Sequence, residues 1–213
     1  MSSLSRSRAR ATSGVTESYL AGRAGGQTPL DADEADGLIP SWVATRADLD
    51  RVEQEGVARA IGWSRGRRLQ PHDIVDEPFV RQLHKRMFGN VWRWAGHYRR
   101  TNKNIGVEYP YITEEIGKLV ADARHWLAEE DLVADEAAVR FHHRLVLIHP
   151  FPNGNGRHAR LAADLLLTAC GGGPLTWGRE LAGDPGSAPA EYVAALREAD
   201  AGDVARLLAF ARR

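Results

Sequence analysis

Cysteine is almost absent from this 213-residue sequence, which contains only Cys170. A single cysteine excludes an intrachain disulfide and suits a reducing compartment, so we expect a cytoplasmic protein. The sequence has no apolar run long enough to cross a bilayer, and its Arg-rich start lacks the apolar segment of a signal peptide. Neither charge is in excess, because Lys and Arg together number 28 and so do Asp and Glu. The composition therefore predicts no membrane partner and gives no strong sign of nucleic-acid binding.

Sustained apolar periodicity is missing from residues 1–36, which are rich in Ser, Arg, Ala, Gly and Thr. Such a segment buries too little apolar surface to order itself, so we expect a mobile N-terminal arm. Residues 37–213 are expected to form one domain. A chain of 213 residues with 43% hydrophobic content supports one substantial core.

Apolar residues recur at helical spacing along most of this domain. Thr45 is suited to cap a helix that carries Leu49 and Val52, and Asp76 with Pro78 is a typical helix start. There is no internal repeat and no alternation typical of a parallel sheet. The pattern predicts an all-α fold with helices over residues 45–61, 76–87, 113–126, 135–148, 157–169, 191–199 and 203–212.

Residues 98–112 depart from the helical pattern. Asn102 and Asn104 favour turns, whereas Val107, Tyr109 and Ile112 favour extended chain. We therefore expect a short non-helical segment between two helices.

The residues with the most chemical content lie in the stretch 149–160, which reads HPFPNGNGRHAR. Glycines on both sides of Asn155 let the backbone approach an anion closely, and the helix that follows directs its free N–H groups into the loop. Arg157 and Arg160 are three residues apart, so both guanidinium groups lie near the start of that helix. His149 adds a proton acceptor next to this anion cradle. The combination indicates transfer from a nucleotide.

This stretch resembles the active-site motif of Fic proteins, HPFx(D/E)GNGRxxR, and differs at one fixed position, where Asn153 replaces the acidic residue. Looser similarity from about residue 25 onward resembles a Fic subgroup called mobile mystery protein B. The resemblance implies an all-α Fic-type helical bundle over residues 37–213, with the core motif at 149–160. It also implies that residues 98–112 form the family's flap, a small β-hairpin that aligns a target protein.

The activity implied by the resemblance is protein adenylylation, in which AMP moves from ATP to a Ser, Thr or Tyr hydroxyl. His149 would take the hydroxyl proton, and the phosphates would be held by the residues Gly154, Asn155, Gly156, Arg157 and Arg160. Mg²⁺ would accompany the ATP, and Asn153 would be a weak ligand for it. The subgroup further suggests the toxin of a toxin–antitoxin pair, with a separate antitoxin as a partner.

Several alternatives remain open from the sequence. One is a Doc-like protein phosphotransferase, although the Doc motif has Lys where this chain has Gly156-Arg157; transfer of another nucleotide, or removal of the modification, is also possible. Another is a catalytically weak nucleotide-binding or interaction module, because Asn153 brings no charge to a metal. Many Fic proteins are restrained by a glutamate that pairs with the second motif arginine, here Arg160. The nearest match to that glutamate motif is Glu55, followed by Gly56, which makes Glu55 a candidate regulatory residue.

Overall fold

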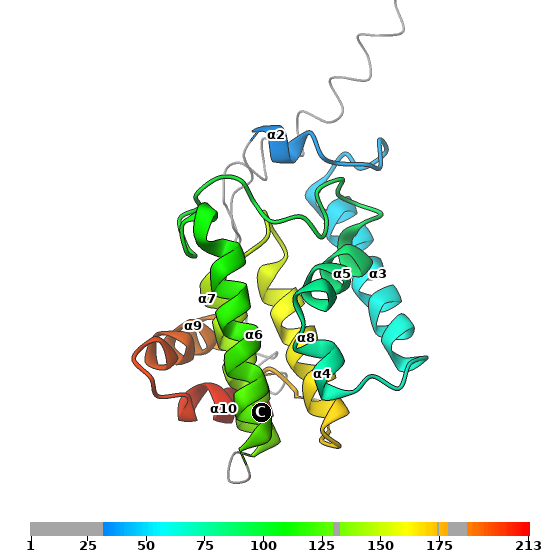
Figure 1. Ribbon diagram of the computed structural model, residues 1–213. Coiled ribbons are helices and arrows are strands. Elements are labelled where there is room, and N and C mark those ends of the chain that lie inside the picture. Colours follow the sequence, from blue (N-terminus) through cyan, green and yellow to red (C-terminus); the bar gives the residue numbers. More distant parts are fainter. Residues whose placement is uncertain (1–31, 130–132, 174, 179–186) are drawn as a thin grey trace, which may run out of the picture.

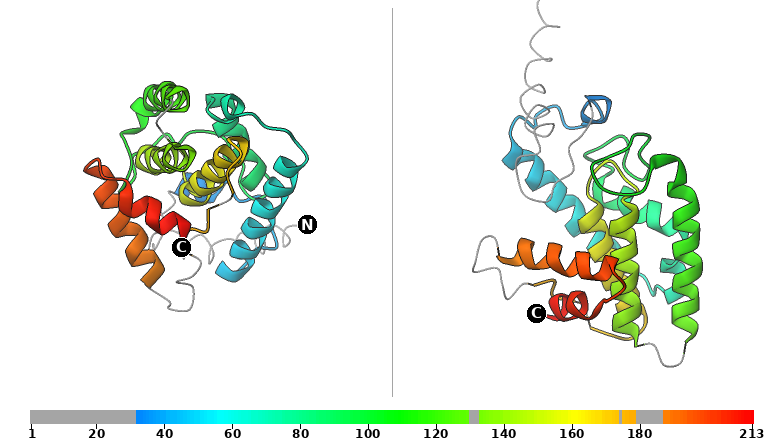
Figure 2. Two further views of the ribbon diagram at one scale, coloured as in Figure 1. Left: turned by 90° about the horizontal axis from the view of Figure 1, so that it is seen from below. Right: turned by 90° about the vertical axis from the view of Figure 1, so that its left-hand side faces the viewer.

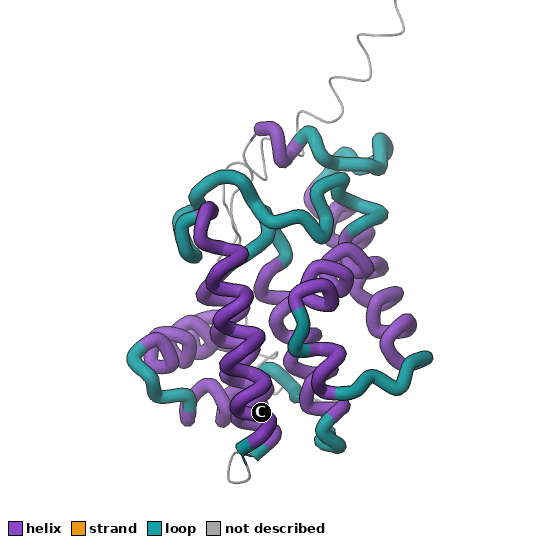
Figure 3. Tube along the Cα trace, viewed as in Figure 1, coloured by secondary structure: helices purple, strands orange, loops and turns teal. Residues whose placement is uncertain are grey.

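The computed structural model describes residues 32–129, 133–173, 175–178 and 187–213, which form a helical bundle (Figure 1). No β-strand occurs in these residues (Figure 3). Leu38 and Trp92 make one isolated antiparallel bridge. The prediction of an all-α fold is confirmed. The elements in chain order are α2 (Ala32–Ala35), α3 (Arg46–Arg65), α4 (Pro71–Ile74), α5 (Glu77–Phe88), the 3₁₀ helix η1 (Tyr109–Tyr111), α6 (Ile112–Ala128), α7 (Ala134–Ile148), α8 (Asn155–Ala169), α9 (Ser187–Asp200) and α10 (Ala205–Arg212).

Helix α3 begins where its capping residues predict. The Thr45 hydroxyl accepts a hydrogen bond from the Asp48 N–H at 3.1 Å, and the Asp48 carboxylate accepts one from the Thr45 N–H at 3.1 Å. Two backbone donors at the helix start are thereby satisfied. The helix continues to Arg65, four residues beyond the predicted end at residue 61.

Helices α7 and α8 lie side by side at the centre of the bundle and flank the loop 149–154, the first half of the motif (Figures 1 and 2). α6 packs on α7, while α4 and α5 pack on α8 and α3 packs on α5. Because α7 ends at Ile148 and α8 begins at Asn155, the loop between them is anchored at both ends by buried helices. The largest fully buried side chains include Phe88, Phe141 and Phe151, and Phe151 belongs to the loop itself.

A smaller apolar cluster attaches the last two helices to the bundle. Ala195 of α9 and Leu207 of α10 are fully buried, and they share this cluster with Val139 of α7 and Ala163 of α8. The predicted helices at 191–199 and 203–212 are thus confirmed. Among the described helices, none combines the length and the apolar content needed to cross a membrane.

The N-terminal arm was predicted to extend to residue 36, and residues 1–31 of it lie outside the described part of the chain. Residues 32–35 form α2, and a turn follows. Ala35 is buried, and the Trp94 indole N–H donates a hydrogen bond to the Glu34 carbonyl at 2.8 Å. These contacts attach residues 34 and 35 to the bundle, and the arm boundary at residue 36 stays a prediction.

Residues 98–112 form an irregular loop that ends in η1, so the expected β-hairpin is not formed. Backbone N–H groups of this loop form hydrogen bonds with the end of α7 and with a side chain of the loop, and not with a neighbouring strand. The Val107 N–H donates to the Ile148 carbonyl at 3.3 Å, and the Tyr109 N–H donates to the Asn102 side chain at 2.9 Å. The loop therefore lies against the end of α7 without forming a ladder.

Candidate active site

His149 occupies the C-terminal cap of α7 and has a left-handed backbone, with φ 53° and ψ 59°. Its N–H still donates to the Leu145 carbonyl at 3.1 Å, which continues the helical hydrogen-bonding pattern by one residue. A non-glycine residue in this conformation carries strain, which the surrounding contacts must hold in place. The strained cap directs the chain out of α7 and into the loop, and it leaves the His149 side chain only 5% exposed.

Burial lowers the pKa of His149 from 6.5 to about 4, and the nearby charges of Arg99 and Lys103 lower it too, while the Val146 backbone partly offsets these effects. The imidazole is therefore uncharged at neutral pH. An uncharged imidazole has a ring nitrogen that accepts a proton, which a general base requires.

The shape of the loop is held by the Asn155 side chain. Its amide oxygen accepts the Phe151 N–H at 2.9 Å, and its amide nitrogen donates to the Phe151 carbonyl at 2.8 Å. Asn155 is 2% exposed, so both polar ends of the amide act inside the protein. Asn155 was expected to hold phosphate; in this structure its side chain shapes the cradle from within.

The backbone at Gly154 turns the chain into α8. Gly154 is the N-terminal cap residue with φ 79°, and a Cβ there would lie 2.6 Å from the Phe88 ring. The loop consequently rests directly on α5. Gly156 differs, because a Cβ at that position would meet no atom within 4 Å. Nothing in the described structure requires a glycine at 156, and the open space above it is available to a ligand.

Two buried histidines, His84 and His158, pack beside the motif loop, and neither was predicted as a site residue from the sequence. His84 of α5 stacks on Phe151 with ring centroids 3.7 Å apart, accepts the Gly96 N–H at 3.0 Å and meets the Asn153 carbonyl at 3.0 Å. Since one ring nitrogen of His84 accepts, the other carries the proton that it donates to Asn153. His158 of α8 meets the Val80 carbonyl at 2.9 Å. Both histidines occur at helical spacing from apolar residues of α5 and α8, and this spacing in the sequence could have indicated that they are buried.

The two motif arginines diverge from the start of α8. The Arg157 guanidinium forms an ion pair with Glu53 of α3 at 2.8 Å and lies over the Phe88 ring, 4.9 Å from its centroid. The Arg160 guanidinium lies over the Tyr192 ring of α9, 5.7 Å from its centroid. A bound polyphosphate would have to lie between these two cations to meet both.

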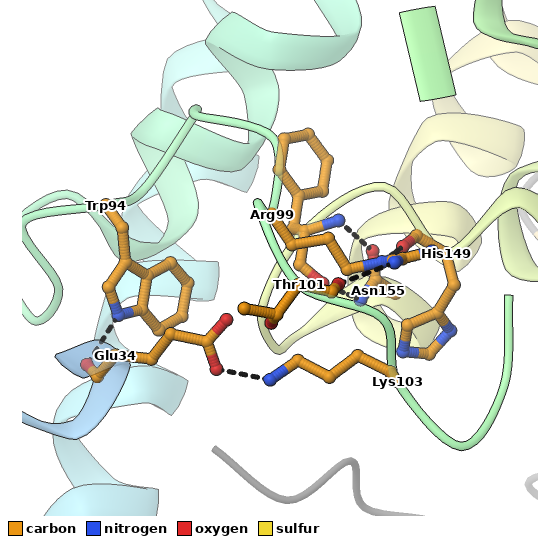
Figure 4. A network of polar contacts seen from close by, with 8 residues as sticks. Glu34, Trp94, Arg99, Thr101, Lys103, His149 and Asn155 are labelled. Carbon is orange, nitrogen blue, oxygen red and sulfur yellow. Dashed lines mark hydrogen bonds and ion pairs between the residues drawn. The ribbon is translucent and has the colours of Figure 1, made fainter. Parts of the chain in front are cut away.

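Arg99 connects the loop 98–112 to the motif loop, and the sequence analysis assigned it no role. Its Nε donates to the His149 carbonyl at 2.7 Å, and its Nη1 donates to the Thr101 carbonyl at 2.8 Å (Figure 4). Its Nη2 donates to the carbonyls of Val107 and Ile148. With 2% exposure, Arg99 is a buried cation whose donors organise the backbone around His149.

Comparison with known families matches residues 74–167 to the Fic/DOC family. The chain is 35% identical over 138 residues to protein adenylyltransferase fic-1 of Caenorhabditis briggsae. The matched region covers 62% of this chain and 25% of that protein. It is 29% identical over 137 residues to protein adenylyltransferase Fic of Nematostella vectensis, covering 62% of this chain and 32% of that protein. Residues 74–167 thus correspond to a Fic/DOC family domain.

Solved structures agree on the fold of this Fic domain. Fic-1 from C. elegans aligns with a TM-score of 0.62 and 24% identity, covering 98% of this chain and 60% of that chain. BepC from Bartonella tribocorum, solved with bound AMPPNP, aligns with a TM-score of 0.61 and 18% identity, covering 85% of this chain and 97% of that chain. The chain spans about a quarter of the length of the fic-1 relative.

The side chain of Asn153, the residue predicted as a weak magnesium ligand, is engaged within the motif loop. The Asn153 side-chain oxygen accepts the Gly154 N–H at 2.5 Å, and Asn153 is 6% exposed. Within the described residues, no group of three or more His, Cys, Asp or Glu side chains is placed to hold a metal ion. An amide oxygen already engaged by the loop is a poor replacement for a carboxylate, which Mg²⁺ prefers.

Glu55 does not meet the second motif arginine of the Fic domain. Its side chain is 59% exposed and lies 3.8 Å from Arg59, one helical turn further along α3. The carboxylate of α3 that reaches the motif is Glu53, two residues earlier, and it meets Arg157. Glu55 and Glu53 therefore lie on different faces of α3, and the regulatory role of Glu55 stays a prediction.

Proposed function

We propose that this Fic domain transfers AMP from ATP to a Ser, Thr or Tyr hydroxyl of a target protein. The observation that carries the proposal is the buried, uncharged His149 at the end of α7, directly before a loop that leads into the N-terminus of α8. A base and an anion cradle in this order suit attack of a hydroxyl on a phosphate. The similarity to proteins named protein adenylyltransferase supports the same activity.

In the proposed reaction, the target oxygen attacks the α-phosphorus of ATP while His149 accepts the hydroxyl proton. A new P–O bond forms to the target, and the bond between the α-phosphorus and the bridging oxygen breaks. Pyrophosphate leaves with the β- and γ-phosphates, and the product is an adenylylated protein. Arg157 and Arg160 would neutralise charge on the leaving phosphates, and backbone N–H groups at the start of α8 would bind the same oxygens.

Mg²⁺ enters this proposal as part of the MgATP co-substrate. Phosphate oxygens and water commonly supply most Mg²⁺ ligands, so the ion does not require a carboxylate at position 153. Binding of ATP is supported by the fold neighbour BepC, which was solved with AMPPNP. We propose that Asn153 acts mainly through the loop and contributes little to the metal.

The target protein is proposed to bind at the loop 98–112. This loop exposes Ile105, Tyr109 and Tyr111, each at 44% or more, beside the backbone that Arg99 connects to His149. Apolar side chains that are exposed together on one loop are suited to a protein partner. Membership of the mobile mystery protein B subgroup, a toxin role with a separate antitoxin, and a cytoplasmic location stay predictions from the sequence.

The test uses ATP labelled at the α- or the γ-phosphate with purified protein and cell lysate. Wild type should attach only the α label to protein, and His149→Ala should abolish it. His97→Ala is the matched control, because His97 is an exposed histidine outside the motif, and it should label like wild type. Label from the γ position alone would indicate the phosphotransferase. No label from either position, with wild type and with Asn153→Asp, would favour the binding module and contradict the proposal.

A further inference from the structure

One carboxylate near the motif is almost completely buried. Glu53 of α3 is 1% exposed and has partners for both oxygens. Its Oε1 accepts the Trp92 indole N–H at 2.7 Å, and its Oε2 meets Arg157 Nη2 at 2.8 Å. Glu53 lies outside residues 74–167, the part of the chain that matches the Fic/DOC family, and so does all of α3.

The position of Glu53 is set by the close packing of α3 on α5. Gly56 lies one turn after Glu53, and a Cβ there would be 2.0 Å from the Met87 carbonyl oxygen. Only a glycine permits this approach. Phe88 follows Met87, and the same Phe88 ring lies beneath Gly154 and beneath the Arg157 guanidinium. The helix contact therefore brings the carboxylate, the ring and the arginine together.

We propose that Glu53 is a positioning residue that holds the Arg157 guanidinium at the edge of the phosphate cradle. The inference rests on the proposed function, because it assigns Arg157 to the β- and γ-phosphates of ATP. A buried carboxylate that lost its cation would be strongly unfavourable, so Arg157 stays on Glu53 whether or not ligand is bound. The long arginine side chain is thereby ordered before the nucleotide arrives, which lowers the entropic cost of binding.

The relative depth of Glu53 and Arg157 favours a role in which Glu53 positions Arg157 over one in which Glu53 competes with phosphate for it. Glu53 is 1% exposed and Arg157 is 30% exposed at the side chain, so the cation lies on the solvent side of the carboxylate. A guanidinium has five N–H donors, and the bond to Glu53 through Nη2 leaves donors for an anion on the outer side. A carboxylate that competed with phosphate would have to occupy the outer side itself.

The test compares Glu53→Gln with Glu55→Gln, a control on the same helix whose carboxylate is 59% exposed. The first readout needs no nucleotide: phenylglyoxal modification of Arg157, followed by peptide mass spectrometry. We expect modification at least fivefold faster in Glu53→Gln and unchanged in Glu55→Gln. An unchanged rate in Glu53→Gln would overturn the inference whatever the enzyme's activity.

The second readout is the affinity for ADP and for AMP, measured by calorimetry. Loss of the ion pair should weaken ADP binding about tenfold and leave AMP binding within about twofold, because AMP lacks the phosphates assigned to Arg157. A general loss of structure would weaken both ligands equally. Equal ADP affinities in wild type and Glu53→Gln would overturn the inference, and tighter ADP binding in the variant would show that Glu53 competes with phosphate.

Failure of the proposed function gives a different result. If Glu53→Gln weakens ADP binding but the wild type transfers no α label, adenylylation is rejected and Glu53 remains a positioning residue. If the wild type binds neither ADP nor AMP, both proposals are overturned. Thermal unfolding monitors the fold of each variant. If Glu53→Gln does not fold, Trp92→Phe removes the indole hydrogen bond to Glu53 and keeps the Glu53–Arg157 ion pair. It should weaken ADP binding two- to threefold without affecting AMP; no change would overturn the inference.

Discussion

Arg99 Nε donates a hydrogen bond to the His149 carbonyl at 2.7 Å, which connects a buried cation directly to the backbone of the proposed base. The same guanidinium donates to carbonyls of the loop 98–112. His149 has a strained left-handed backbone, and this hydrogen bond is one of the contacts that hold it. The loop expected to receive the target and the residue expected to activate it are therefore joined by the hydrogen bonds of one side chain.

Arg99→Lys should lower both stability and activity. A lysine has one compact ammonium group and cannot reach the several carbonyls that the planar guanidinium serves, so buried acceptors lose their donors. We expect the free energy of unfolding to fall by about 2–4 kcal/mol and kcat to fall at least tenfold. Urea unfolding and the α-label assay measure these effects. Arg100→Lys is the matched control on an exposed neighbour, and an equal effect of both variants would contradict the role of Arg99.

Gly156→Ala should separate stability from activity. Alanine favours a helix more than glycine, and a Cβ at 156 would meet no protein atom within 4 Å, so stability should rise by about 0.5 kcal/mol. The added methyl group would occupy the space assigned to phosphate, so ADP affinity should fall at least tenfold. Gly117→Ala in α6 is the control, because a Cβ there also meets nothing, and it should stabilise without affecting ADP binding. Unchanged ADP affinity in Gly156→Ala would remove residue 156 from the cradle.

The rate of transfer should remain high in mildly acidic solution. The pKa of His149 is lowered to about 4, so the imidazole stays uncharged as the pH falls through 6.5, where an ordinary histidine becomes protonated. We expect kcat/KM to be constant between pH 8 and about pH 5.5 and to decline at lower pH. A decline centred near pH 6.5 would show that His149 titrates as an exposed histidine and would contradict its burial.

Stability should decrease with acid before activity is lost through His149. Burial lowers the pKa of His158 to about 4, so the unfolded chain takes up a proton below pH 6.5 that the folded protein does not. Stability is therefore complete above pH 6.5 and falls between pH 6.5 and about 4, by roughly 3 kcal/mol for His158 alone. His158→Gln should give a shallower pH dependence in urea unfolding, and His97→Gln should not. Identical slopes in all three proteins would contradict this assignment.

Asn153→Asp should change the response to Mg²⁺. The substituted carboxylate keeps an oxygen for the Gly154 N–H and adds a negative charge, which an amide lacks and Mg²⁺ prefers. We expect a higher rate of α-label transfer at limiting Mg²⁺ and a smaller difference at saturation. Equal or lower rates across the whole Mg²⁺ titration would show that position 153 does not influence the metal.

Local patterns accounted for the described helices of eight or more residues. Thr45 and Asp48 form the capping box at the start of α3, and the apolar spacing in α7 and α8 places their buried faces correctly. Four-residue helix α4 was missed, since it is too short to show a period. The hairpin expected at residues 98–112 does not form, because the loop carbonyls of Thr101 and Val107 bond to the Arg99 side chain.

For Glu53 and Glu55, the glutamate motif and the helical spacing of apolar residues select different side chains as the one facing the bundle. The glutamate motif selected Glu55, which is exposed. Glu53 shares the buried face of α3 with Leu49, Gly56 and Ala60, at the spacing of successive helical turns. The helical spacing is therefore consistent with the burial of Glu53. Its partner Arg157 in α8 is more than one hundred residues away along the chain, and no local sequence pattern identifies such a partner.

By itself, the sequence determined the helices, the motif 149–160 and the chemistry of its side chains, because these depend on residue type and on neighbours along the chain. Tertiary structure alone decided which cation faces which partner: Arg157 toward Glu53, Arg160 toward Tyr192 and Arg99 toward the His149 carbonyl. It also decided that His149 is uncharged. A lowered pKa and a buried ion pair both arise from removal of water, and only the packing of distant helices removes it.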